Sequence, residues 1–155
     1  MRRAAALSLG ALLFSCGLVH HDYTVSKDFQ VGGGAPGGDL SFNLAEPLAA
    51  SAGDLSKLSS ITLQDAKLLE TDSRDLSFLS SLTISIAGNG LQTVTLASFT
   101  TAPATGVQSV DLGGNPTDLK PYLADGALLT AHATYVSRPV DARALQLVLT
   151  IRGSL

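Results

Sequence analysis

The side chains best suited to chemistry in this sequence are one thiol, three imidazoles and thirteen scattered carboxylates. His20, His21 and Asp22 stand side by side, and imidazole and carboxylate groups are ligands of zinc and other transition metals. Adjacent residues rarely close a coordination shell, and no third histidine lies nearby to complete one. The spacing therefore predicts no metal site.

The remaining reactive groups do not form a recognisable catalytic pattern. His132 shares strand parity with Thr130 and Thr134, which predicts a solvated face rather than a general base. No G-x-S-x-G elbow is present for a serine nucleophile. Six of the carboxylates fall at predicted turns and caps, where capping explains them more simply than a glycosidase-type pair; they are Asp54, Asp72, Asp75, Asp118, Asp125 and Asp141. We expect a non-enzymatic protein without catalytic residues or a cofactor, and keep a carboxylate enzyme as an alternative.

The N-terminus has the layout of an export signal. Arg2 and Arg3 make a positive start, and residues 4–14 form an apolar core. Serine and glycine interrupt this run, which falls short of the roughly 20 residues that a membrane-spanning helix needs. The pattern predicts a helical signal peptide over residues 1–15.

Leu13, Ser15 and Cys16 resemble the lipobox of bacterial lipoproteins, although Phe14 stands where that family usually has a small or β-branched residue. The resemblance covers residues 1–16 only. It implies that the thiol carries a diacylglycerol with palmitate-type acyl chains, and that cleavage makes Cys16 the first residue. An exported protein with one cysteine has no disulfide partner, and acylation would account for that single thiol. A thiol nucleophile is then excluded.

The same resemblance indicates where the protein resides. Gly17, rather than Asp, follows the cysteine, and by likeness to enterobacterial sorting this favours the outer membrane of the cell envelope. The membrane, through the lipid, is then one partner, and an envelope protein is a possible second. Two alternatives stay open. An ordinary leader cut after Gly17 would give a periplasmic or secreted protein, and an uncleaved leader would itself be the anchor.

Removal of the leader leaves 140 residues, about one domain with one core. Eight basic residues then face thirteen acidic ones, a formal net charge of −5. The absence of a basic run argues against nucleic-acid binding. We divide the chain into a signal peptide (1–15), a lipidated cysteine with its tether (16–22) and a single domain (23–155).

Serine and threonine alternate with leucine, valine and isoleucine along this domain, as in strands with one buried face. Glycine, proline and asparagine separate the runs, and a glycine-rich loop over residues 32–38 lacks the lysine of a phosphate-binding loop. We expect a final hairpin between the last two runs and, overall, an all-β antiparallel sandwich of about eight strands with short helical turns. The strands are predicted at 23–31, 39–44, 60–70, 81–88, 91–99, 107–112, 127–137 and 143–152.

A short internal repeat is the most informative feature of this domain. Residues 54–63 and 75–84 are identical at seven of ten positions, and each begins Asp-Leu-Ser before its apolar residues alternate. Asp54 and Asp75 suit the cap of one helical turn ahead of a strand, and residues 118–123 look like a third such turn. The leucine spacing also resembles the leucine-rich repeat, whose solenoid is the alternative fold. Its units would start 21, 12 and 16 residues apart, and two of these intervals are shorter than a coil requires.

Taken together, these features predict a membrane-anchored lipoprotein whose β-sandwich has a binding or structural role. A carrier that holds an apolar ligand between its sheets is an alternative, as is a soluble exported protein without the lipid.

Overall fold

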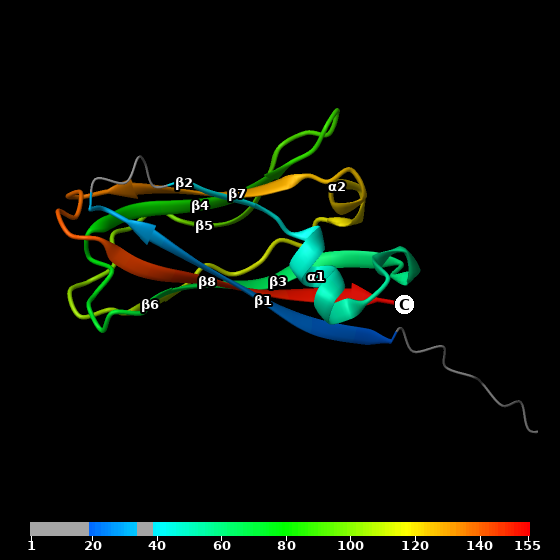
Figure 1. The fold of residues 1–155 in the computed structure, drawn as a ribbon, viewed down its shortest axis with the longest axis horizontal. Helices are drawn as coiled ribbons and strands as arrows, with labels where there is room; N and C mark the ends of the chain where they lie inside the picture. Colours follow the sequence, from blue (N-terminus) through cyan, green and yellow to red (C-terminus); the bar gives the residue numbers. More distant parts are fainter. Residues whose placement is uncertain (1–18, 34–38) are drawn as a thin grey trace, which may run out of the picture.

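The computed structural model describes residues 19–33 and 39–155 and shows two antiparallel four-stranded sheets packed face to face (Figure 1). One sheet has the order β1-β8-β3-β6, and the other has the order β2-β7-β4-β5. The first contains β1 (His20–Val31), β8 (Arg143–Ser154), β3 (Ser60–Glu70) and β6 (Ser109–Asp111). The second contains β2 (Asp39–Asn43), β7 (Leu128–Tyr135), β4 (Leu79–Ala87) and β5 (Val94–Phe99). The predicted all-β antiparallel sandwich is confirmed.

The strand pairs are nested along the chain. The strand β4 pairs with β5, β3 with β6, β2 with β7 and β1 with β8, always antiparallel. This is the order obtained when one long hairpin is wound over two sheets, and it defines a jelly-roll sandwich. Gly88, Asn89 and Gly90 lie in the central β4–β5 connection.

The core lies between the sheets and follows the predicted alternation. On β8, the residues Leu145, Leu147, Leu149 and Ile151 are each at most 1% exposed, and their neighbours face outward. On β1, Val25 and Val31 are buried, whereas Lys27 at the same parity is exposed and lies over the Phe42 ring. Since β1 is an edge strand, this lysine protects a free sheet edge.

The internal repeat is also a structural repeat. Asp54 accepts hydrogen bonds from the Ser56 amide (3.0 Å) and hydroxyl (2.6 Å), and caps the 3-10 turn η1 (Leu55–Lys57). Asp75 does the same with the Ser77 amide (3.1 Å) and hydroxyl (2.6 Å). One copy leads into β3 and the other into β4, so the repeat starts one inner strand of each sheet.

The third predicted turn is the short helix α2 (Lys120–Ala124), which precedes β7. Its N-cap is Leu119 rather than Asp118. Asp118 nevertheless accepts bonds from the Lys120 amide (3.1 Å) and from the Ile61 amide (2.9 Å) on β3. Its carboxylate therefore ties this turn to the first sheet.

Three expectations differ from the structure. The strands are antiparallel pairs in two sheets, which excludes the stacked coils of the solenoid. The strands β7 and β8 belong to different sheets, so the predicted final hairpin is wrong, and residues 136–142 carry the chain across the sandwich. The helix α1 (Ala45–Ala52) was not predicted, since only short helical turns were expected beside the strands. Proline is tolerated in a first helical turn, and the alanines that follow favour helix.

The backbone of Gly114 lies against the bulge in β3. The pairing of β3 with β8 shifts between Leu63 and Asp65, and a Cβ on Gly114 would lie 2.3 Å from the Gln64 carbonyl oxygen. We expect Gly114→Ala to lower the free energy of unfolding by about 1–3 kcal/mol or more, because backbone must move. Urea titration followed by circular dichroism measures this loss.

Gly153→Ala is the matched control. Its added Cβ would meet the Leu58 side chain at 2.9 Å and the Tyr23 ring at 3.1 Å, and both of these groups can rotate. If Gly153→Ala lowered the free energy of unfolding as much as Gly114→Ala does, the collision with the β3 backbone would not be the cause of the Gly114→Ala effect.

Candidate functional site

The lipobox-like residues Leu13, Ser15 and Cys16, and the predicted signal helix, lie outside the described residues. The described chain starts at Val19, whose carbonyl accepts the Leu155 amide at 3.0 Å. The strand β1 starts at His20, three residues earlier than predicted, because β8 extends to Ser154 and offers it a partner. His20 Nδ1 also lies 2.9 Å from the Ser154 hydroxyl. The predicted tether over residues 16–22 is therefore wrong at its C-terminal end, since residues 20–22 belong to the sheet.

Strand geometry sets the His21 side chain apart from those of His20 and Asp22. Neighbouring side chains on a strand point to opposite faces, and Asp22 is bound by Arg152 across the strand pair at 2.7 and 2.9 Å. This hydrogen-bonded ion pair holds the pKa of Asp22 below its ordinary value. Among residues 19–33 and 39–155, no group of three or more His, Cys, Asp or Glu side chains is placed to hold a metal ion.

His132 lies on the outer face of β7, as its parity predicted, and its imidazole contacts the Asp39 carboxylate on β2. Both side chains are 60% exposed. Hydroxyl pairs continue this face on either side, between Ser41 and Thr130 (2.9 Å) and between Ser81 and Thr134 (2.6 Å). The pair therefore belongs to a flat polar sheet surface rather than to a cleft that could exclude water from a reaction.

Three of the predicted carboxylates accept backbone amides from loops and strand ends. Asp72 accepts the Ala144 amide at 3.1 Å, and Asp125 accepts the Asn89 amide at 2.6 Å, so each fixes a loop to a distant segment. Asp75 accepts the Gly106 amide at 3.0 Å in addition to Ser77. The bonds from the Ser77 hydroxyl, the Gly106 amide and the Ser77 amide hold the pKa of Asp75 below its ordinary value.

Asp75 therefore contributes to the pH dependence of stability. A carboxyl whose pKa is lowered in the folded state stabilises the protein above its unfolded pKa, about 4, and this contribution is lost as the pH falls through the folded pKa. We expect Asp75→Asn to flatten the acid limb of the stability curve below pH about 4. Urea unfolding at a series of acidic pH values tests this. An unchanged slope would show that the Asp75 charge does not contribute.

One buried ion pair was missed by the sequence reasoning. The Glu70 side chain is fully buried, and its Oε1 accepts Arg143 Nε at 3.0 Å. Its Oε2 accepts the amides of Asp72 and Arg74, both at 2.9 Å. Arg143 also donates to the Asp75 carbonyl at 2.5 Å. Both carboxylate oxygens are thus occupied, and the pair fastens the β3–β4 loop to β8.

An aromatic pair covers the Arg143 side of this cluster. The guanidinium carbon of Arg143 lies 4.7 Å from the centroid of the Phe78 ring, and Phe78 stacks on Tyr135 with centroids 6.2 Å apart. The Tyr135 hydroxyl is buried without a hydrogen-bond partner, and burial raises the pKa of this phenol. The Arg143 guanidinium, the Phe78 and Tyr135 rings and the β3–β4 loop pack together as one unit. This cluster therefore has a structural role.

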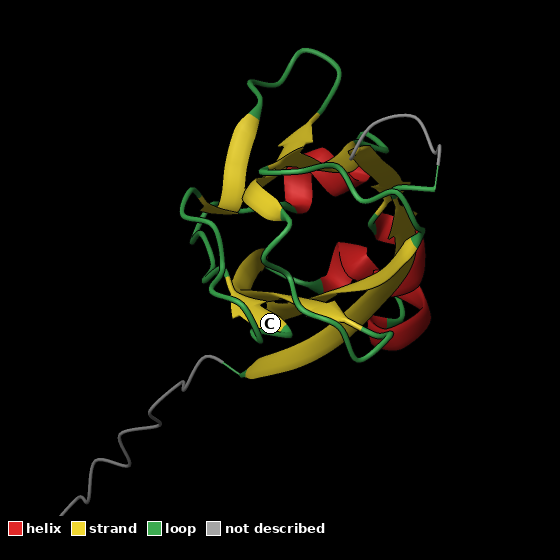
Figure 2. Ribbon diagram, turned by 90° about the vertical axis from the view of Figure 1, so that its left-hand side faces the viewer, coloured by secondary structure: helices red, strands yellow, loops and turns green. Residues whose placement is uncertain are grey.

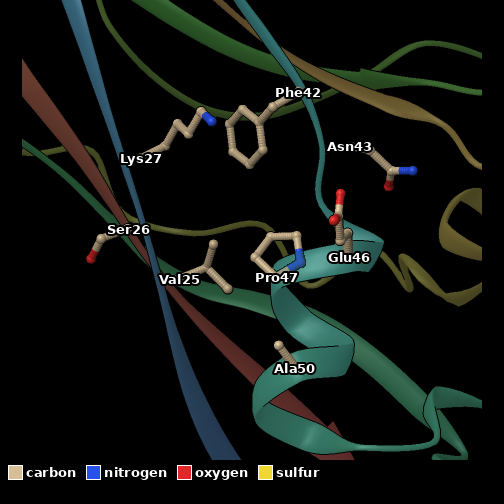
Figure 3. A pocket seen from close by; sticks show the side chains of 8 residues that line it. All are labelled: Val25, Ser26, Lys27, Phe42, Asn43, Glu46, Pro47 and Ala50. Atoms are coloured by element: carbon tan, nitrogen blue, oxygen red, sulfur yellow. The ribbon is translucent and has the colours of Figure 1, made fainter.

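A hollow of about 440 Å³ lies between the edge strands β1 and β2 beside α1 (Figure 3). Val25, Phe42 and Pro47 give it apolar walls, and Lys27 and Glu46 place opposite charges at its rim. The Lys27 ammonium lies 5.9 Å from the Phe42 ring centroid. The groove can accept a ligand with both polar and apolar parts, but it holds no nucleophile paired with a base.

A second hollow, of about 220 Å³, lies between η1 and α2 and is almost wholly apolar. Leu55, Ile61 and Leu123 line it, and the Lys120 ammonium at its edge donates to the carbonyl oxygens of Ser56 (3.2 Å) and Leu58. Figure 2 looks along the sandwich from the end opposite the helices, which lie in the centre and right-hand part of that view. None of the helices in the described part of the chain is long and apolar enough to cross a membrane.

Strand pairing and surface together define a jelly-roll β-sandwich with polar outer faces and an edge groove. No protein-family model and no curated protein matches the chain. Two similar solved structures are those of Desmodium yellow mottle tymovirus (15% identity, 99% of this chain and 94% of that chain, TM-score 0.38) and turnip yellow mosaic virus (10% identity, 100% and 92%, TM-score 0.41). Likeness at these TM-scores carries no inference about function.

Proposed function

We propose that the protein is a bacterial lipoprotein, held on a membrane of the cell envelope by a lipid on Cys16. The observation that carries the proposal is the position of the only thiol, which ends a leader of export type and follows Leu13 and Ser15 at lipobox spacing. The start of β1 at His20 agrees with this arrangement, because the folded domain begins only four residues after the cysteine. Gly17 after the cysteine favours the outer membrane.

The sandwich itself has a non-enzymatic role in this proposal, as a binding or structural module. The arrangement of the described carboxylates supports this role: those of Asp54, Asp75 and Asp118 accept backbone amides in turns, and that of Glu70 is buried against Arg143. Fully buried leucine and isoleucine side chains from both sheets fill the space where a carrier would hold its ligand. Both observations favour a binding or structural module over the carrier and the carboxylate enzyme.

The mass of the N-terminal peptide tests the anchoring. The full chain, with its leader, is expressed in a diderm bacterium, recovered from the membrane fraction and digested. We expect a peptide that begins at Cys16 and carries diacylglycerol, with or without an amide-linked acyl chain. An unmodified peptide that begins at Leu18 or nearby would overturn the proposal and identify a soluble exported domain.

A further inference from the structure

The end of the sandwich where β1 begins carries two exposed apolar side chains. Val19 is 51% exposed and Leu155 is 57% exposed. The Leu155 amide donates to the Val19 carbonyl at 3.0 Å, so the two residues are neighbours just beyond the paired ends of β1 and β8. His20, Ser154 and Ser60 form the next row of the sheet. Figure 1 shows the start of β1 and the C-terminal end of the chain together at this end of the molecule.

Covalent geometry limits how far this end can lie from Cys16. Three residue steps separate Cys16 from Val19, and a fully extended chain spans at most about 3.3–3.6 Å per residue, or roughly 11 Å in all. A bilayer is about 30 Å thick in its hydrocarbon and about 40–45 Å with its headgroup layers. A cysteine acylated at the interface would therefore bring Val19 and Leu155 to the headgroup layer.

We propose that Val19 and Leu155 form a membrane-contacting patch, which places this end of the sandwich against the lipid surface. This inference rests on the proposed anchoring through Cys16 and goes beyond it, because a flexible tether would leave the orientation of the domain free. The occupant is the interfacial layer of the bilayer itself, since apolar side chains that lie beside an acyl anchor gain by burial there.

One pair of charges near the patch does not oppose this contact. Asp22 and Arg152, two rows from it, neutralise each other through two hydrogen bonds of 2.7 and 2.9 Å. No lone carboxylate of this row would then oppose an anionic lipid surface. The patch needs no basic cluster, because the acyl chains supply the attraction to the membrane and the two side chains supply only the orientation.

The contact would set the sandwich upright on the membrane. The strand β1 has 12 residues, and at about 3.3–3.4 Å per residue it spans close to 40 Å. Val31 and its partner Arg143 then lie at the far end with the loop of residues 136–142. Val140 in that loop is 91% exposed, and it provides a control position away from the lipid.

The sequence contains no tryptophan, so single substitutions give clean fluorescent reporters. The full lipidated chain, purified as Val19→Trp, Leu155→Trp or the matched control Val140→Trp, is reconstituted into phosphatidylethanolamine and phosphatidylglycerol vesicles. Some of the acyl chains are brominated near the headgroup. We expect the tryptophan fluorescence of Val19→Trp and of Leu155→Trp to be mostly quenched by the brominated chains, compared with vesicles without bromine. Their emission maximum should also shift to shorter wavelength. The fluorescence of Val140→Trp should not be quenched.

The outcomes separate the patch from the anchor. Flotation of each variant with the vesicles, together with the mass of its N-terminal peptide, reports on anchoring independently of fluorescence. If the chains float but neither Val19→Trp nor Leu155→Trp is quenched, the patch is overturned and the anchoring stands. Equal quenching of Val140→Trp would mean that the domain lies flat, which also overturns it. An unmodified chain that does not float would remove the anchoring and the patch with it.

Discussion

Cys16→Ser is expected to shift the protein almost completely out of the mature membrane-bound form, into a soluble or an unprocessed form. A serine hydroxyl replaces the thiol that the lipid would modify, and no second cysteine is available. Each buried methylene of an acyl chain contributes about 0.8 kcal/mol, so two or three long chains hold a protein on a membrane essentially permanently. Two exposed side chains such as Val19 and Leu155 cannot replace that attraction.

The measurement is fractionation of the host cell, with the leader followed by mass. Ser15→Ala is the matched control, because alanine keeps a small residue directly before the cysteine and should leave the protein in the membrane fraction. If Cys16→Ser stayed on the membrane with its leader removed, something other than the lipid would hold the protein there, and the anchoring proposal would be wrong.

Local patterns predicted the strands well because both sheets bury one face. The alternation of Leu145, Leu147, Leu149 and Ile151 fixed β8, and β3 was predicted with both of its bounds. Pairing was harder to predict, because a jelly roll joins β1 to β8 and β2 to β7 across most of the chain. No local pattern records such distant partners, and for this reason β7 and β8 were expected to form a hairpin.

The candidate site was predicted less well than the fold. The turns at Asp54, Asp75 and Asp118 were expected, since the residues that define them lie within three positions of each carboxylate. Glu70 was missed, although it continues the inward parity of Ala66 and Leu68 and could have been recognised as a buried charge. Its partner Arg143 is 73 residues away, and only the sheet brings the two together.

Arg143→Met is expected to lower the free energy of unfolding by about 3–5 kcal/mol, because it leaves the Glu70 carboxylate buried without its counter-charge. That is a large share of the 5–15 kcal/mol typical of a domain. Urea unfolding of the chain from Gly17 onward, followed by circular dichroism, measures the change. The exposed pair of Lys67 and Asp111, 3.0 Å apart, is the matched control, and Lys67→Met should cost no more than about 1 kcal/mol.

A double variant separates the buried charge from the packing. Glu70→Gln removes the negative charge but keeps an oxygen that can accept the amides of Asp72 and Arg74. If the unpaired Glu70 carboxylate causes the loss of stability, the double variant Glu70→Gln with Arg143→Met should be more stable than Arg143→Met alone. The reason is that replacing both members of a buried pair costs less than removing one. If the double variant is less stable than Arg143→Met, the loss comes instead from the contacts of the guanidinium with the Phe78 ring and the Asp75 carbonyl.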